Sequence, residues 1–297
     1  MVQSHLNGFG WRSKTLAGEL GLTRFGSTEF KWGMKTYVMG IINVTPDSFS
    51  GDGLDGSVVA SLDQARQFVT DGADIIDVGG ESTRPGSAPI DVDEELRRVI
   101  PVIETLSKEI GVPISIDTYR AEVAKKAVDV GAHMINDVWG LKKDADMANV
   151  VATIDVPIVI TQNQRGSLYE DFIPDLIADL QKSIDLALSA GIKWENIILD
   201  PGVGFGKTIG QNLEIVRRLT EIKALKRPIL LGTSRKSFIG YTLALPVEQR
   251  LEGTAATVAI GIVNGADIVR VHDVKEMVRV VKMSDAVVRP GYYEAEG

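Results

Sequence analysis

Residues 72–75 read Gly-Ala-Asp-Ile, and closely similar segments recur as Gly-Ala-His-Met at residues 131–134 and Gly-Ala-Asp-Ile at residues 265–268. Glycine suits the left-handed backbone position that ends a helix, and the apolar residues that follow suit the beginning of a strand. Each copy therefore predicts a helix that ends at the glycine and a strand that begins three residues later.

Short apolar runs of this kind recur along the chain from Tyr37 onward, separated by polar or glycine-rich loops and by segments with helical spacing. The runs cover residues 37–44, 75–78, 114–116, 134–138, 158–160, 197–199, 229–231 and 268–271. Strands that alternate with helices predict a parallel sheet. A closed (β/α)8 barrel and an open doubly wound sheet both satisfy this alternation, and eight units favour the barrel.

The length of 297 residues suits one such domain. We therefore predict an α/β protein with a single (β/α)8 TIM barrel over residues 31–297, preceded by a short N-terminal extension, residues 1–30. The first eighteen residues contain Arg12 and Lys14 but no acidic residue, which faintly resembles a transit segment. They lack the apolar core of a secretory signal. We favour a poorly ordered or loosely attached extension.

The composition excludes several kinds of protein. With 32 Lys+Arg against 40 Asp+Glu, the net charge of −8 argues against a nucleic-acid partner. The absence of cysteine excludes disulfides, zinc–thiolate sites and thiol nucleophiles, and it fits a cytoplasmic location. The three histidines, His5, His133 and His272, are too far apart in the chain to suggest a histidine-rich metal cage. The longest uncharged stretch beyond the N-terminal region, residues 253–266, is too short to span a membrane.

Polar residues gather where the predicted strands end, which is where TIM-barrel enzymes carry their chemistry. They are Asn43, Asp77, Asp117, Asn136, Asp137, Asp200, Lys236, Arg270 and His272. A single Asp or Asn at such a place could be a helix N-cap, but so many together indicate a ligand site. An unpaired carboxylate is costly in a narrow barrel mouth, so Asp117, Asn136 and Asp200 need donors from a ligand or from cations.

The residue types indicate what the ligand carries. A fused heterocycle with an aminopyrimidinone edge offers adjacent N–H groups that a carboxylate can accept in parallel. Lys236, Arg270 and His272 lie on the last two strands, where many barrels bind phosphate, and they suggest a phosphorylated substrate. Asn43 and nearby phosphate oxygens could hold Mg²⁺, which keeps several waters and takes few protein ligands.

The glycine-rich loop at residues 202–208 invites a nucleotide-binding interpretation, but its spacing rejects it. A Walker A loop requires glycine where Pro201 stands, and a G-x-G-x-x-G motif requires glycine where Lys207 stands. We interpret the loop as a tight turn that lets the backbone approach a ligand, with Phe205 as an apolar wall. We place Lys207 outside the site and expect Lys207→Ala to be far milder than Lys236→Ala.

Several of these segments resemble the signatures of the dihydropteroate synthases. Residues 39–50, MGIINVTPDSFS, resemble the first signature, and residues 77–86, DVGGESTRPG, resemble the second. The segments around Asp117, Asn136 and Asp200 are similar to later motifs of the family, in the same order. So are Ser-Arg-Lys-Ser at residues 234–237 and Arg-Val-His-Asp at residues 270–273.

The resemblance implies a transferase of folate biosynthesis that condenses 4-aminobenzoate with 6-hydroxymethyl-7,8-dihydropterin diphosphate. It also implies a sulfonamide target and a homodimer formed through outer helices. The pterin would be held by Asp117, Asn136, Asp200 and Lys236. The diphosphate would be held by Asn43, Arg270 and His272, with Mg²⁺ at Asn43. Thr83 would contact the pterin diphosphate. Arg84, Pro85, Phe49, Phe205 and Ser237 would shape the aminobenzoate pocket. Those expected to act in catalysis are Lys236, Asp117, Arg270 and His272.

Two departures from the family pattern stand out. Thr161-Gln162-Asn163 follows the fifth strand where the family usually has a Met-His pair, and Gln162 cannot carry a proton or a charge. The first loop reads Ser50-Gly51-Asp52-Gly53, which moves its acid by one position. Two alternatives stay open: a pterin-dependent methyltransferase of the same barrel family, and a non-catalytic pterin-binding paralogue.

Overall fold

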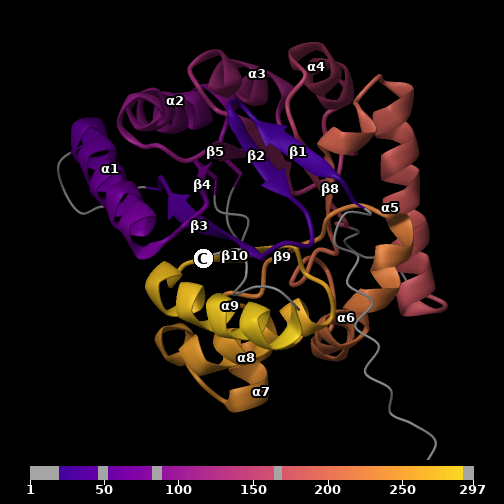
Figure 1. Cartoon of the computed structure of the whole chain (residues 1–297). Helices are drawn as coiled ribbons and strands as arrows, with labels where there is room; N and C mark the ends of the chain where they lie inside the picture. Colours follow the sequence, from indigo (N-terminus) through magenta and orange to yellow (C-terminus); the bar gives the residue numbers. More distant parts are fainter. Residues whose placement is uncertain (1–19, 46–52, 82–88, 164–168, 290–297) are drawn as a thin grey trace, which may run out of the picture.

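Eight parallel strands form a barrel in the computed structural model, which describes residues 20–45, 53–81, 89–163 and 169–289 (Figure 1). The strands are β3 (Tyr37–Asn43), β4 (Ile75–Gly79), β5 (Ile114–Asp117), β6 (Met134–Asp137), β7 (Ile158–Thr161), β8 (Ile197–Asp200), β9 (Leu230–Leu231) and β10 (Ile268–Val271). Their order is β8-β7-β6-β5-β4-β3-β10-β9. A parallel bridge between Leu199 and Ile229 joins the two outermost strands. The predicted (β/α)8 barrel is confirmed, and the open-sheet alternative is wrong.

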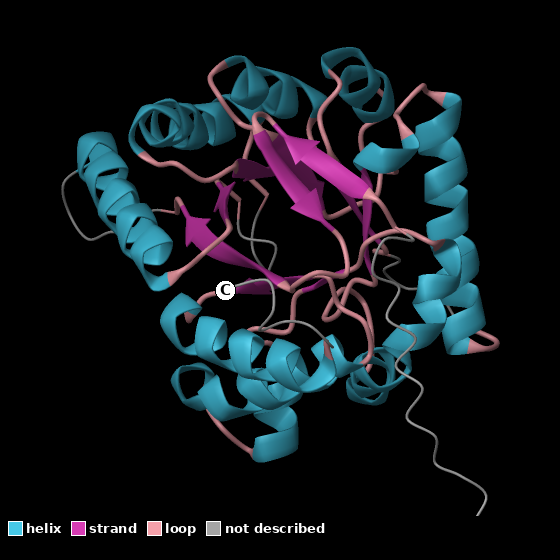
Figure 2. Cartoon of the chain, in the orientation of Figure 1, coloured by secondary structure: helices cyan, strands magenta, loops and turns pink. Residues whose placement is uncertain are grey.

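Helices surround the barrel on all sides (Figure 2). They are α1 (Gly53–Asp71), α2 (Val92–Glu109), α3 (Ala121–Asp129), α4 (Met147–Ile154), α5 (Phe172–Ser189), α6 (Ile209–Ile222), α7 (Ser237–Leu243), α8 (Leu251–Val263) and α9 (Val274–Val288), with 3-10 turns η1 (Trp194–Asn196), η2 (Lys223–Leu225) and η3 (Val247–Gln249). In the described ranges, no helix is long and apolar enough to cross a bilayer.

The three repeated segments end a helix at the glycine and lead into a strand, as predicted, and the structure explains the residue type at their third position. Gly72, Gly131 and Gly265 all have positive φ angles, between 100° and 116°. The third residue of each copy accepts a hydrogen bond from the backbone N–H at or beside the start of a neighbouring strand. The bonds are Val38 N to Asp74 Oδ2 at 2.8 Å, Ile114 N to His133 Nδ1 at 3.2 Å and Ile229 N to Asp267 Oδ2 at 2.9 Å. An acceptor at this position therefore helps to fix the register of adjacent strands.

A hairpin closes the end of the barrel at which the strands begin. It comprises β1 (Leu22–Phe25) and β2 (Thr28–Lys31), and Figure 1 shows it lying across that end. Phe25, Phe30 and Trp32 are buried with side chains from the barrel interior. The extension expected at residues 1–30 is therefore packed structure from Leu20 onward, because aromatic burial holds the hairpin in place. Residues 1–19 lie outside the described residues.

Candidate active site

A cluster of four polar side chains from four strands occupies the mouth of the barrel. Arg270 on β10 donates from Nε to Asp77 Oδ2 on β4 at 2.6 Å, and from Nη2 to Asp117 Oδ2 on β5 at 2.7 Å. Asn136 on β6 donates from Nδ2 to the same Asp77 oxygen at 3.2 Å. The predicted residues Asp117, Asn136 and Arg270 are thus brought together. We call Asp77, Asp117, Asn136 and Arg270 the central cluster.

The central cluster holds more acceptors than the protein satisfies. In the part of the chain that the structure describes, Asp77 Oδ1, Asp117 Oδ1 and Asn136 Oδ1 are buried and accept no hydrogen bond. Burial raises the pKa of Asp117 to about 7, Arg270 opposes that rise, and the negative charge of Asp77 adds to it. Buried polar atoms in native proteins are nearly always paired, so these oxygens indicate that a ligand supplies the donors.

Asp77 is predicted as a strand-end polar residue without a specific ligand contact, although the internal repeat marks it. Asp77, Asn136 and Arg270 each stand five residues after the glycine of one of the three repeated segments. The repeat therefore carries them to equivalent positions on three strands, and the structure joins all three by hydrogen bonds. An internal repeat thus predicts contact between residues far apart in the chain.

A second group of site residues lies beside β8. Lys236 donates to the main-chain oxygen of Val203, and its Nζ lies 4.9 Å from the centre of the Phe205 ring. Asp200 accepts the backbone N–H of Gly202 at 2.7 Å. Burial lowers the pKa of Lys236 to about 8, and the nearby Asp200 opposes this shift. Burial raises the pKa of Asp200, opposed chiefly by Lys236. The two groups therefore lie near enough at the mouth for each to favour the charged form of the other.

The remaining predicted residues occupy the edge of the mouth. His272 Nδ1 lies 3.0 Å from Ser234 Oγ, which also accepts the His272 backbone N–H. Asn43 is half-buried at the last position of β3, and Ser237 is exposed at the first position of α7. In the described ranges no three His, Asp or Glu side chains gather as a metal site. Four predicted residues, Phe49, Thr83, Arg84 and Pro85, lie outside the described residues, as does Asp52.

Lys207 is not remote from the site, contrary to expectation. Its Nζ donates to Gln162 Oε1 at 2.6 Å, Gly202 O at 2.9 Å, Gln162 O at 3.1 Å and Phe205 O at 3.2 Å. Burial lowers the pKa of Lys207 to about 7, opposed by Asp200. Spacing in the sequence could not show this, because the contact joins loops that follow two different strands. Lys207 is therefore unsuitable as a control for Lys236.

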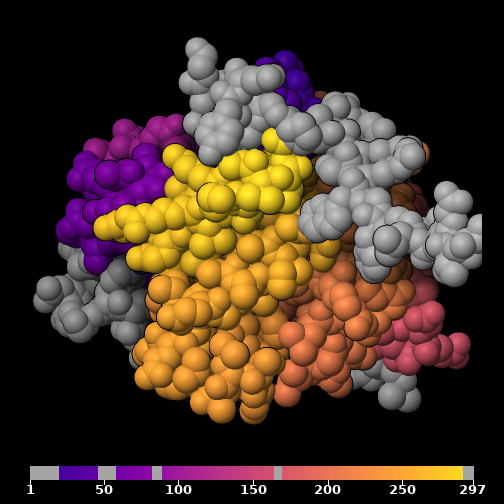
Figure 3. Space-filling model, turned by 60° about the horizontal axis from the view of Figure 1, so that its bottom comes forward, coloured from indigo at the N-terminus to yellow at the C-terminus, as the bar shows by residue number. Residues whose placement is uncertain are grey.

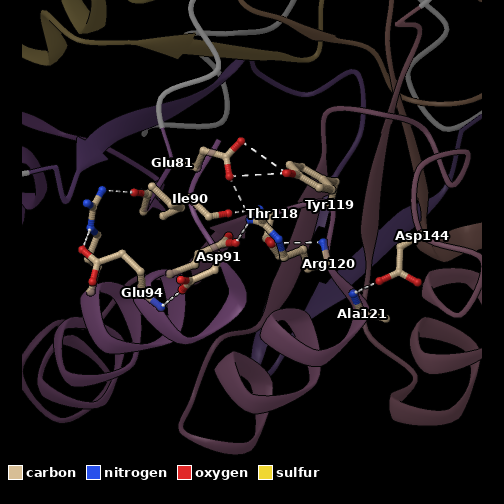
Figure 4. A network of polar contacts seen from close by, with 12 residues as sticks. Glu81, Ile90, Asp91, Glu94, Thr118, Tyr119, Arg120, Ala121 and Asp144 are labelled. Atoms are coloured by element: carbon tan, nitrogen blue, oxygen red, sulfur yellow. Dashed lines mark hydrogen bonds and ion pairs between the residues drawn. The ribbon is translucent and has the colours of Figure 1, made fainter. Parts of the chain in front are cut away.

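On the opposite wall, Arg120 connects the two described flanks of the loop after β4 (Figure 4). Its guanidinium pairs with Glu81 at 2.9 Å and with Glu95, and donates to the main-chain oxygen of Ile90 at 2.5 Å. Tyr119 Oη also donates to Glu81, at 3.3 Å. The connection from β4 to α2 is thus held at both ends by one side chain.

Comparison with known proteins identifies the family. A family model described as "Pterin binding enzyme" matches residues 39–272. The dihydropteroate synthase of Clostridium beijerinckii is 52% identical over 267 residues, covering 90% of this chain and 99% of that protein. The dihydropteroate synthase of Bacillus subtilis is 54% identical over 257 residues, covering 86% of this chain and 90% of that protein.

Solved structures agree with the sequence relatives. The dihydropteroate synthase from Clostridium difficile, crystallised in the presence of pteroic acid, matches with a TM-score of 0.86 at 53% identity, covering 88% of this chain and 99% of that one. The Xanthomonas albilineans enzyme with 4-aminobenzoic acid matches with a TM-score of 0.85 at 38% identity, covering 90% of this chain and 97% of that one. The chain therefore belongs to the dihydropteroate synthase family and is a transferase of folate biosynthesis.

Proposed function

We propose that the central cluster binds the pterin ring in the family reaction, which condenses 4-aminobenzoate with 6-hydroxymethyl-7,8-dihydropterin diphosphate to give 7,8-dihydropteroate. The observation that carries this proposal is the set of three buried oxygens, on Asp77, Asp117 and Asn136, to which no described residue donates. The aminopyrimidinone edge of a pterin presents N–H groups side by side, which such oxygens accept. The pteroic acid named with the Clostridium difficile structure supports a pterin ligand.

The cations beside this pocket suit the leaving group. Loss of diphosphate leaves a dihydropterin methylene cation, so the chain needs to stabilise separating charges and needs no protein nucleophile. Lys236, Arg270 and His272 supply donors at the mouth, and Lys236 is held beside the Phe205 ring. Arg270 already neutralises two carboxylates, which leaves Lys236 as the cation with fewer charged partners among the described residues. We therefore assign Lys236 to the diphosphate end together with His272, in place of the pterin role that the resemblance implies for it, and we keep Asp200 with the pterin.

Magnesium fits this mouth only together with the substrate. Asn43 offers one amide oxygen at the end of β3, and the described residues provide no cluster of acidic ligands. Mg²⁺ commonly binds through few protein ligands, several waters and substrate phosphates. We propose that Asn43 helps to hold Mg²⁺ on the diphosphate, where the ion would neutralise charge on the leaving group.

The aminobenzoate would lie between Phe205 and Ser237, near the outer edge of the mouth. Both follow strands, and Lys236 is next to each of them: its Nζ lies 4.9 Å from the centre of the Phe205 ring, and Ser237 is the next residue in the chain. The Xanthomonas albilineans structure with 4-aminobenzoic acid and the Yersinia pestis structure with a sulfonamide drug support an aminobenzoate pocket of this kind. Thr83, Arg84, Pro85 and Phe49 keep the roles that the resemblance implies for them.

We also propose that the chain forms homodimers through α8 and α9. These helices lie side by side on the face shown in Figure 3. Ile260 and Val263 on α8, and Met283 and Val287 on α9, are exposed apolar side chains. A helix with apolar residues on its outward side as well as its buried side commonly covers an interface. The molar mass in solution, measured by light scattering for the chain and for Ile260→Glu, tests this face.

A binding experiment tests the central cluster directly. Asp117→Asn should lower the affinity for 6-hydroxymethylpterin, which carries no diphosphate, by at least about tenfold because an amide cannot accept two parallel N–H groups. Asp129→Asn is the matched control, since Asp129 is exposed at the end of α3, away from the mouth. Isothermal titration calorimetry measures both. Equal affinities in Asp117→Asn and the unchanged protein would contradict the proposed pterin pocket.

A further inference from the structure

The ammonium group of Lys207 ties two loops together. Its four acceptors belong to Gln162, which follows β7, and to Gly202 and Phe205, which follow β8. An ammonium has three N–H donors, so this position uses its full capacity on uncharged oxygens. Within the described residues no carboxylate pairs directly with Lys207. The side chain therefore serves neither a surface ion pair nor a solvated helix face.

The backbones of these two loops are in close contact at the same place. Gly202 has a φ of +72°, and a Cβ added there would come within 1.8 Å of the Gln162 carbonyl oxygen. The Gln162 backbone N–H also donates to Asp200 O at 2.8 Å. Only glycine permits this approach, which places Lys207 over a junction rather than over an open gap.

The side chain of Gln162 is oriented for this contact by its other neighbours. Its Nε2 donates to Asp179 Oδ2 at 3.2 Å, and Asp179 in turn pairs with Lys142 at 2.6 Å. Because the carboxylate requires the NH2 end of the amide, the Oε1 end must face Lys207. Gln162, in the segment where the family usually has a Met-His pair, thus completes the tie.

The loop held by Lys207 is also the loop that holds Lys236. Val203 lies between Gly202 and Phe205, whose carbonyls bind Lys207, and its own carbonyl accepts from Lys236. The Phe205 ring faces the same Lys236 ammonium. A shift of this loop would therefore move two contacts of Lys236 at once.

We propose that Lys207 is a positioning residue for Lys236. Its ammonium fixes the 202–207 loop against Gln162, so that the Val203 carbonyl and the Phe205 ring keep Lys236 directed into the mouth. The inference rests on the role proposed above for Lys236. Lys207 itself touches neither substrate nor the reacting atoms.

A double-mutant cycle tests this coupling, with affinity for 6-hydroxymethyl-7,8-dihydropterin diphosphate as the readout, because Lys236 is assigned to the diphosphate end of that substrate. Lys207→Met keeps the length of the side chain and removes its donors. It should weaken binding by about tenfold in the unchanged background, and have little further effect in Lys236→Ala, because the group it positions is then absent. Lys182→Met, on the exposed side of α5, is the matched control and should change neither value.

The outcomes separate this inference from the proposed function. An equal loss from Lys207→Met in both backgrounds would overturn the positioning role, since the effect would then not pass through Lys236. Unchanged binding and turnover in Lys236→Ala would instead overturn the role of Lys236. If Lys207→Met does not fold, Gln162→Leu decides the matter, because it removes one acceptor and leaves the main-chain acceptors. It should weaken binding only when Lys236 is present, and an equal loss in Lys236→Ala would overturn the inference.

Discussion

At the end of the barrel covered by the hairpin, the buried polar groups around Asp285 and Trp32 are paired, whereas several at the mouth have no partner among the described residues. At the covered end, Asp285 accepts from the Thr36 backbone N–H at 2.7 Å and from Arg289 Nε at 2.7 Å. Trp32 Nε1 donates to Thr23 Oγ1 at 3.0 Å inside the same end. At the mouth, three carboxylate or amide oxygens of the central cluster are buried without a donor.

The difference separates the part of the molecule that secures the fold from the part that binds substrate. Satisfied hydrogen bonds and packed aromatic rings lower the free energy of the folded chain at the covered end. Unsatisfied acceptors at the mouth raise it until a ligand supplies donors. Arg227 Nη2 is one exception at the covered end, where it is buried without a hydrogen-bond partner among the described residues. Substitutions at the two ends should therefore change different measurements.

The largest effect is expected from Lys236→Ala at the mouth. Turnover should fall by at least about 100-fold, because a cation directed at the leaving group is lost. The melting temperature should change little, since burial lowers the pKa of Lys236 and thus disfavours its charged form in the folded chain. Diphosphate release and differential scanning calorimetry measure the two quantities. A large loss of stability with normal turnover per folded molecule would contradict the assignment of substrate binding to the mouth and of stability to the covered end.

Trp32→Ala should give the reverse result at the covered end. Trp32 is 1% exposed and packs edge-on against Phe30 and Tyr37. Removing a buried indole should lower the free energy of unfolding by about 3–5 kcal/mol, with turnover per folded molecule unchanged. Urea denaturation measures the change. Met34→Ala is the control nearby, since that side chain is 51% exposed. A Trp32 variant with lower turnover and unchanged stability would contradict this assignment.

Pterin affinity should rise with pH through about 7, because the carboxylate form of Asp117 accepts the N–H groups and burial raises its pKa to about 7. Arg270 opposes the shift, while Asp77, Glu95 and Asp137 add to it. Below that pH, affinity should fall by about tenfold per unit. Calorimetric titrations with 6-hydroxymethylpterin between about pH 5.5 and 8.5 measure this. Asp117→Asn should bind weakly and show no such slope, and an identical slope in both proteins would exclude Asp117 as its source.

The same group gives the opposite trend for the free protein. The pKa of Asp117 in the folded chain lies above its ordinary value, so the folded state holds this proton more tightly than the unfolded state. Its contribution to stability is therefore present at acid pH and is lost as the pH rises through about 7. The mouth thus binds pterin best under conditions where Asp117 stabilises the chain least.

The sequence predicted two features of the molecule: the repeated helix–strand segments and the polar side chains at the ends of strands. The glycine-led repeats predicted the barrel, and strand-end positions brought Asp117, Asn136 and Arg270 into contact. The hairpin was missed because its short strands precede the repeating strand–helix pattern and contain Arg24, Glu29 and Lys31 in place of an apolar run. The contact of Lys207 with Gln162 was missed because it depends on how two loops meet in space.

The smallest effect is expected from Arg120→Lys, which should separate the binding of 4-aminobenzoate from the binding of the pterin. Arg120 holds Glu81 and the Ile90 carbonyl, the two flanks of the segment that contains Thr83, Arg84 and Pro85. A lysine ammonium cannot reproduce the forked contacts of a guanidinium, so the flanks should be held less firmly. The KM for 4-aminobenzoate should rise by roughly tenfold or less, while pterin affinity, set by the side chains of the central cluster, should stay the same.

Steady-state kinetics with each substrate varied in turn, together with pterin titration, measure this division of the mouth. Arg66→Lys is the matched control, because Arg66 makes an exposed ion pair with Glu109 on the outer helices. If Arg120→Lys weakened both substrates equally, the aminobenzoate and pterin regions of the mouth would not be independent. If it lowered only the melting temperature, Arg120 would belong with the covered end as a residue that secures the fold. A selective change in the aminobenzoate KM is the only result that places it with the chemistry, because stability alone does not distinguish one substrate from the other.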